Sequence, residues 1–263
     1  AFSDQGFLAS LYNQTSMTLN QRLSAAAHGS LSHANPLTRV QMTSLAHSLA
    51  QRLPRTVLDI GSGPGTFSID LSRICPASIT AIDVNPYFLA RAQSAMQDQP
   101  LLGQIDFRLE DASHIGAQHF DAVVCMGASQ AFGTPREALE RCATLTNPGG
   151  TVLFADLVWS ADPPDEFLAF LGTSKSQYWT ESEAEVVFKQ SELMIIQREV
   201  ASHPAWQAYE TAILHGRLEF AETLNPVEAE QVRRGARAWA EAVEQYGQYC
   251  FGFEAYLAVK PRV

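Results

Sequence analysis

A glycine-rich turn between a strand and a helix constrains the fold of this chain more than any other feature. The run Thr56–Ile60 is apolar apart from Asp59, and it predicts a strand buried on both faces. Gly61-Ser62-Gly63-Pro64-Gly65 follows and leads into a segment with helical apolar spacing. Glycines permit a close approach of ligand to backbone, and the next helix offers free N–H groups at its start. The pattern therefore predicts an α/β sheet that binds a ligand at its strand ends.

Short β-rich runs alternate with helical patterns from about residue 36 to 160, which is typical of a parallel sheet covered by helices. After a long helical excursion, two more strand patterns suggest an antiparallel edge pair. The fold class we expect is α/β, with a Rossmann-like, seven-stranded, mostly parallel sheet, that edge pair and a helical lid. The expected strands are 56–60, 79–83, 105–109, 120–125, 151–157, 193–200 and 251–259.

Helix starts and turns leave local signals in the sequence. An Asn-Pro pair predicts an N-cap followed by a first-turn proline, and a Thr with Glu three residues later predicts a capping box. The Asn-Pro pairs begin at Asn35, Asn85 and Asn225, the boxes are Thr134/Glu137 and Thr180/Glu183, and 147–150 reads as a tight turn.

Acidic residues follow the next two expected strands. Asp83 lies at the end of the second strand and is suited to accept hydrogen bonds from ribose hydroxyls. Asp111-Ala112 follows the third strand, where an acid and a backbone N–H could meet adenine. The dinucleotide fingerprint G-x-G-x-x-G is not matched, because Thr66 stands where its third glycine would be. A nicotinamide oxidoreductase is therefore disfavoured.

These residues together resemble the class I S-adenosylmethionine-dependent methyltransferases of the small-molecule type, over about residues 36–160. The resemblance implies S-adenosylmethionine as the cofactor and no metal. It implies that the methionine part lies against Asp59 and the glycine turn, the ribose against Asp83, and the adenine against Asp111. The full set of cofactor-binding residues that we expect is Asp59, Gly61, Ser62, Gly63, Gly65, Asp83, Val84, Asp111, Ala112, Met126 and Gly127.

The expected domain organisation is an N-terminal helical cap segment, 1–35, and a cofactor-binding domain, 36–263. Lid insertions are expected around 158–190 and 205–248, where aromatic residues gather. In such a fold the appended parts choose the acceptor.

Catalytic candidates come from segments expected to border the reacting centre. His33 precedes the helix that leads into the first strand and is the best candidate for a base, if one is needed. Tyr178 could face the sulfonium, and Ser129 follows the fourth strand. Tyr12, Gln130 and Trp179 are candidates for substrate or lid contacts. Packing in the lid remains the alternative for Tyr178 and Trp179, and a surface position for the histidine.

The composition limits the kinds of molecule that this protein is expected to bind. The net charge of −10, from 28 acids and 18 bases, disfavours a nucleic-acid substrate. No apolar run approaches the ~20 residues that span a bilayer. No signal segment opens the chain and no CxxC pair appears, so we expect reduced thiols in a cytoplasmic protein. The oligomeric state stays open, with a homodimer as one alternative.

The leading hypothesis is a methyltransferase acting on a small molecule, in secondary metabolism. One alternative is an enzyme that cyclises S-adenosylmethionine itself, giving azetidine-2-carboxylate and methylthioadenosine. A second is a non-catalytic regulator that binds the same nucleoside.

Overall fold

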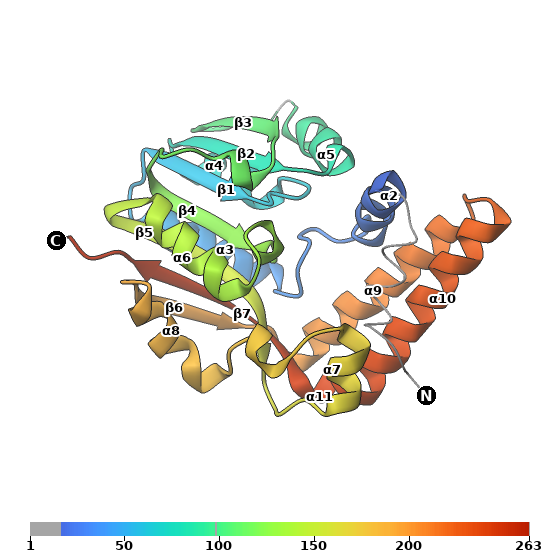
Figure 1. The fold of residues 1–263 in the computed structure, drawn as a ribbon. Coiled ribbons are helices and arrows are strands. Elements are labelled where there is room, and N and C mark those ends of the chain that lie inside the picture. Colours follow the sequence, from blue (N-terminus) through green and yellow to red (C-terminus); the bar gives the residue numbers. More distant parts are fainter. Residues whose placement is uncertain (1–16, 98, 263) are drawn as a thin grey trace.

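A mixed sheet lies at the centre of the molecule (Figure 1). The computed structural model describes residues 17–97 and 99–262, and within these ranges the sheet has seven strands in the order β3-β2-β1-β4-β5-β7-β6. β7 is antiparallel to both of its neighbours, and the other pairs are parallel. The predicted fold class is confirmed. The strands are β1 Thr56–Ile60, β2 Ser78–Asp83, β3 Gln104–Leu109, β4 Phe120–Met126, β5 Thr146–Trp159, β6 Met194–Val200 and β7 Phe251–Val259.

Helices cover both faces of the sheet, and apolar side chains bury the two interfaces. α3 (Arg39–Ala50) and α4 (Thr66–Ile74) share one core cluster, whereas α6 (Pro135–Leu145) and α8 (Ala184–Gln190) share the cluster on the other face. α5 (Pro86–Met96) packs on β2 and β3. The burial of these two faces is the main stabilising contribution.

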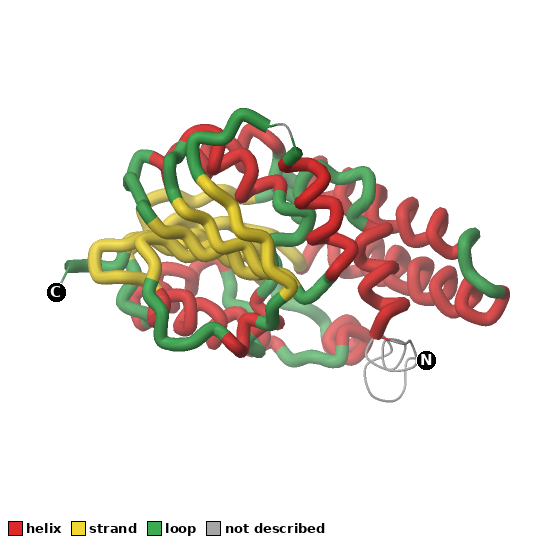
Figure 2. The backbone as a smooth tube through the Cα atoms, turned by 90° about the horizontal axis from the view of Figure 1, so that it is seen from above, coloured by secondary structure: helices red, strands yellow, loops and turns green. Residues whose placement is uncertain are grey.

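A second group of helices lies beyond the carboxyl ends of the parallel strands (Figures 1 and 2). α9 (His203–Ala221) and α10 (Pro226–Ala242) form a long pair, and α2 (Met17–Ala27) packs against α9. α7 (Asp165–Leu171), a π-helical turn at Val243–Gly247 and α11 (Gln248–Cys250) connect this group to β5 and β7. The carboxyl edge of the sheet therefore faces helices that are not part of its covering layers.

Two local predictions were wrong. α3 does not begin after Asn35-Pro36 but at Arg39, where Thr38 and Gln41 form the capping box. The Asn35 side chain instead accepts a hydrogen bond from Leu37 N at 3.0 Å, so it closes a turn before the helix. The segment 147–150 lies within β5, because Gly149 and Gly150 exchange backbone hydrogen bonds with Lys260 after β7.

The other cap predictions are confirmed. Asn85 caps α5 and Asn225 caps α10, each with a first-turn proline. Thr134 and Thr180 form their capping boxes with Glu137 and Glu183.

The structure also bears on several other expectations from the sequence. The four cysteines are free and buried. Across residues 17–97 and 99–262, no helix combines the length and apolarity needed to cross a bilayer. In the same ranges no group of three or more His, Cys, Asp or Glu side chains could hold a metal ion. Tyr12 lies outside the described residues.

Candidate functional site

The glycine turn after β1 is folded by three left-handed residues. Gly61, Gly63 and Gly65 have φ of +64°, +54° and +72°. A Cβ on Gly61 would lie 2.3 Å from the Ala128 Cβ, and one on Gly65 would lie 2.7 Å from the Phe107 ring. A Cβ on Gly63 would meet only Ala34, at 3.8 Å. Gly61 and Gly65 therefore let the turn pack closely, whereas the buried Gly63 has no neighbour that close.

Asp83, at the carboxyl end of β2, fastens this turn. Its Oδ2 accepts a hydrogen bond from Gly63 N at 2.8 Å, and its Oδ1 accepts one from Asn85 N at 2.7 Å. Burial raises the pKa of Asp83, while these backbone hydrogen bonds oppose the rise. Each carboxylate oxygen has a second acceptor site, so Asp83 can still bind a pair of hydroxyl donors beside the turn.

Helix α2 is tied to the same loop. Gln21 Nε2 donates to the carbonyl of Val84 at 2.9 Å, and Asn85 Nδ2 donates to the carbonyl of Gln21 at 2.9 Å. Arg91 on α5 donates to the carbonyls of His28 and Leu31 at 3.0 and 2.9 Å. The segment that follows α2 is thus held over the β2 end of the site. The Val84 side chain itself is exposed.

A small cavity of about 40 Å³ lies beside the turn. Asp59 lines it, with only 3 % of the residue exposed, and Ser68 Oγ donates to Asp59 Oδ2 at 2.6 Å. Burial raises the pKa of Asp59 to about 7. A cationic group entering this cavity would favour the carboxylate form. The remaining lining residues are His33, Ala34, Asn35, Met42, Gly61, Ser62, Gly63, Pro64, Thr66, Phe67 and Met126.

The cavity also holds an unsatisfied hydroxyl. Ser62 Oγ is buried and has no hydrogen-bond partner among the described residues. A buried polar atom without a partner is costly, and at a site it indicates a group that a ligand completes. An acid, a hydroxyl without a partner and the backbone of the glycine turn line the cavity. These groups suit the amino-acid end of a cofactor.

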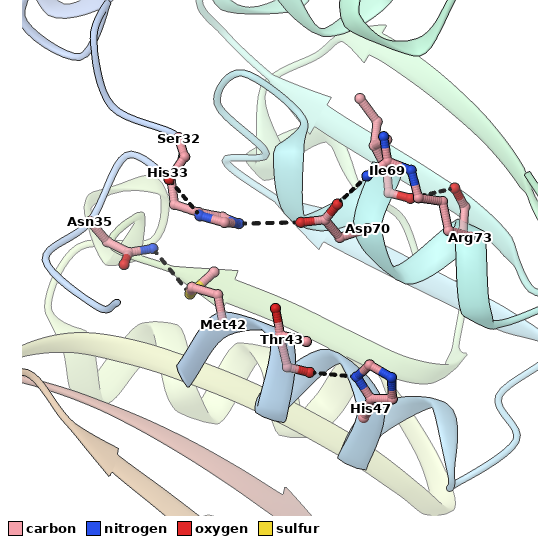
Figure 3. A network of polar contacts seen from close by, with 10 residues as sticks. Ser32, His33, Asn35, Met42, Thr43, His47, Ile69, Asp70 and Arg73 are labelled. Atoms are coloured by element: carbon pink, nitrogen blue, oxygen red, sulfur yellow. Dashed lines mark hydrogen bonds and ion pairs between the residues drawn. The ribbon is translucent and has the colours of Figure 1, made fainter. Parts of the chain in front are cut away.

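His33 connects the segment before α3 to helix α4 (Figure 3). Its Nδ1 lies 3.3 Å from Ser32 Oγ, and its Nε2 lies 3.7 Å from Asp70 Oδ2. Contact with His33 is the main cause of the lowered pKa of Asp70, and Arg73 adds to it. The ring lines the cavity, and its Nε2 is buried without a hydrogen-bond partner among the described residues. Asp70 is its nearest charged neighbour, which suits a residue that holds the cavity wall.

The acid after β3 lies on the same edge as Asp83. Glu110 N donates to the Asp83 carbonyl at 3.1 Å. Asp111 is the next residue, so it lies near Asp83. Asp111 caps a short 3₁₀ turn, Ala112–His114, by accepting from Ser113 N at 2.8 Å. The Ser113 hydroxyl, and then this backbone contact, lower the pKa of Asp111. Ala112 is buried. The structure thus brings the glycine turn, Asp83 and Asp111 together.

The chain leaving β4 supplies the other side of the site. Met126 is half-buried and lines the cavity, and Gly127 is exposed with a φ of +69°. Ser129 is buried, whereas Gln130 is exposed.

Tyr178 and Trp179 point into different environments. The Tyr178 ring packs edge-on against Trp159 and Phe251, with centroids 5.4 and 6.1 Å apart, and burial raises its pKa to about 12. It lines an open hollow of about 910 Å³. Trp179 is 3 % exposed and belongs to the core cluster that contains α8. These surroundings favour packing for Trp179 and leave Tyr178 beside the site.

Sequence reasoning missed Asp156. This acid is 6 % exposed near the carboxyl end of β5, and burial raises its pKa. Its signal was present, because it is the one acid in the otherwise apolar run Val152–Trp159.

The central part of the chain is similar to a known protein family. The family described as "Methyltransferase domain" matches residues 57–150. The uncharacterized protein YjhP of Escherichia coli K12 is 24% identical over 230 residues, covering 86% of this chain and 92% of YjhP. A ubiquinone biosynthesis O-methyltransferase of Xanthomonas campestris is 33% identical over 104 residues, which are 38% of this chain. The chain spans 42% of the length of that relative.

Solved structures share the fold across nearly the whole chain. A SAM-dependent methyltransferase from Geobacter sulfurreducens, in complex with S-adenosyl-L-homocysteine, has a TM-score of 0.80 at 23% identity and covers 90% of this chain and 97% of its own. The crystal structure of YjhP has a TM-score of 0.81 at 22% identity and covers 91% and 99%.

Proposed function

Because residues 57–150 are a methyltransferase domain in a chain with the class I S-adenosylmethionine-dependent methyltransferase fold, we propose that this protein binds S-adenosylmethionine and methylates a small molecule. The observation that carries the proposal is the contact between Gly63 N and Asp83 Oδ2. It fixes the glycine turn and a hydroxyl acceptor side by side at the carboxyl edge. Fold neighbours crystallised with S-adenosyl-L-homocysteine support it.

The proposed roles follow from the contacts. Asp83 binds the ribose hydroxyls, and the backbone of Gly61 to Gly63 lies along the methionine part. Asp59 lies in the cavity that would receive the ammonium group, and Ser62 Oγ supplies a hydrogen bond there. Asp111 and Ala112 lie where adenine is expected. When bound, the cofactor supplies an electrophilic methyl group on a sulfonium.

His33 and Tyr178 take different roles in this proposal. The ion pair of His33 with Asp70 holds the segment before α3 against α4, so His33 positions the wall of the cofactor cavity. Tyr178 contributes an aromatic wall beside the expected position of the sulfonium. Collinear placement of nucleophile, methyl carbon and sulfur supplies much of the acceleration in such a transfer.

A small-molecule acceptor is supported by charge and by the relatives. The net charge of −10 opposes binding to polyphosphate. Several relatives are named ubiquinone biosynthesis O-methyltransferases. Ubiquinone belongs to primary metabolism, so these names do not favour secondary metabolism, and we propose no pathway.

One experiment tests the proposal. The purified protein is titrated calorimetrically with S-adenosylhomocysteine and then incubated with S-adenosylmethionine, with and without a cell extract that supplies acceptors. We expect binding, and S-adenosylhomocysteine formed only with the extract. Methylthioadenosine formed without an acceptor would instead indicate the cyclising enzyme, and binding without turnover would indicate the regulator. Absence of binding would overturn the proposal.

A further inference from the structure

Strand β5 extends beyond its parallel neighbour β4. Gly127 N, just after β4, donates to the Ala155 carbonyl at 2.7 Å, and this is the last hydrogen bond of that ladder. Farther along β5, Trp159 N donates to the Trp179 carbonyl at 3.0 Å. Alternate residues of a strand direct their backbone groups to the same neighbour. Leu157 therefore faces a gap between Gly127 and Trp179, which we term the sheet notch.

The Asp156 carboxylate occupies the sheet notch. Its Oδ1 accepts a hydrogen bond from Leu157 N at 2.7 Å, which takes the place of the missing strand. Ser129, in the loop after β4, lies near Asp156 and opposes the rise in its pKa that burial causes. Asp156 Oδ2 is buried and has no hydrogen-bond partner in residues 17–97 and 99–262. An unsatisfied buried carboxylate oxygen costs several kcal/mol of folding free energy, so it indicates a missing donor.

The notch lies between the two hollows of the site. Met126, directly before Gly127, lines the small cavity at the glycine turn. Trp159 and Tyr178, on the other side of the notch, line the larger hollow. Burial is the main cause of the raised pKa of Tyr178, and the negative charge of Asp156 adds to it. Asp156 follows Ala155, the β5 partner of Met126, and stands three residues before Trp159, so it lies along β5 between a residue of each hollow.

We propose that the Asp156 carboxylate faces the transferred methyl group and binds an acceptor with a nucleophilic O–H or N–H, whose proton it receives. This inference rests on the proposed function and narrows its acceptor class. The acceptor forms the new bond to the methyl carbon while the electron pair of the carbon–sulfur bond stays with sulfur. The proton leaves the acceptor for Asp156 Oδ2. Burial, which raises the pKa of Asp156, makes its carboxylate a better proton acceptor.

Sinefungin tests this placement without knowledge of the acceptor. This cofactor analogue carries an ammonium-bearing carbon in place of the methylated sulfur, whereas S-adenosylhomocysteine carries a neutral thioether. Both affinities are measured calorimetrically for the wild type, for Asp156→Asn and for Asp106→Asn, a matched change at an exposed acid on β3. We expect Asp156→Asn to weaken sinefungin binding about tenfold and to leave S-adenosylhomocysteine within twofold. Asp106→Asn should change neither affinity.

The outcomes distinguish a failure of the proposed function from a failure of the inference about Asp156. If the wild type binds neither compound, the proposed function fails. If the wild type binds both and Asp156→Asn keeps their affinity ratio, or weakens both equally, then Asp156 only shapes the loop and the inference fails alone. If Asp156→Asn does not fold, Asp156→Ser gives the same comparison, because it is neutral and keeps an acceptor near Leu157. Failure of both variants to fold would assign the carboxylate to stability and overturn the inference.

Discussion

At the scale of single residues, Asp83 combines two tasks. It holds Gly63 N and Asn85 N, and it keeps acceptor capacity for a ligand at the same edge. Hydrogen bonds to a charged acceptor are worth about 1.5–3 kcal/mol each. The side chain is therefore the strongest single candidate for a determinant of cofactor affinity.

We expect Asp83→Ala to weaken S-adenosylhomocysteine binding about tenfold or more, because the ribose loses its charged acceptor and the turn loses its anchor. Isothermal titration calorimetry measures the affinity, and Asp106→Ala serves as the control at an exposed acid. Equal affinities of the wild type and Asp83→Ala would contradict the role assigned to Asp83.

Asp59 should make stability depend on pH. Its pKa rises from 3.8 to about 7 in the folded protein because of burial. A raised pKa contributes stability that is full below the unfolded value and is lost as pH rises through the folded value. We expect Asp59→Asn to remove a fall of up to roughly 4 kcal/mol in unfolding free energy between pH 4 and 8.

Urea unfolding of the wild type and Asp59→Asn at pH 5 and pH 8, without ligand, measures this effect. The difference between the two proteins cancels other groups that titrate in this range. Parallel pH dependences would show that Asp59 ionises at its ordinary pKa in the folded state.

Single residues also show what could be predicted from the sequence. Asp59, Asp83 and the glycines could be placed at one edge because strand ends and turns leave local signals. Trp179 and Tyr178 could not be separated, since a one-residue step decides which side of the sheet a side chain meets. Asp156 was missed because its surroundings, Ser129 and the end of the β4 ladder at Gly127, come from a distant segment of the sequence.

At the scale of elements, the β1–α4 turn lies where α4, α5 and the sheet meet. Its Gly65 is the N-cap of α4, and its α-carbon faces the Phe107 ring of β3 and Ala92 of α5. A side chain at position 65 would push α4 away from β3 and α5. The start of α3, in contrast, has a capping box formed by Thr38 and Gln41.

We expect Gly65→Ala to destabilise the protein by roughly 2–4 kcal/mol, because a φ of +72° is strained for alanine and the added methyl overpacks the site. Gly116→Ala is the matched control, since its Cβ would meet nothing within 4 Å. Thermal or urea unfolding compares the two variants. A Gly65→Ala protein as stable as Gly116→Ala would mean that the turn relaxes freely.

At the scale of the whole molecule, α2 connects the helices beyond the sheet to the site. It packs against α9, its Gln21 bonds to the loop after β2, and Arg91 holds the segment that follows it. Because these contacts cover the β2 end of the site, they should slow the departure of a bound nucleoside.

We expect Arg91→Ala to raise the dissociation rate of S-adenosylhomocysteine several-fold, since the segment after α2 loses two hydrogen bonds. Stopped-flow displacement measures the rate, and Arg55→Ala, at an exposed arginine on the opposite edge of the sheet, is the control. An unchanged rate for Arg91→Ala would show that α2 does not gate the site.

The close approach of Gly61 to Ala128 limits which pairs of residues these two positions can accept. The methyl group of Ala128 fills the space that a side chain at 61 would need, at 2.3 Å. A side chain at position 61 should therefore be accepted only together with Ala128→Gly, and a larger residue at 128 only while position 61 stays glycine. A library randomised at both codons and selected for folding should return few clones with bulky residues at the two positions at once.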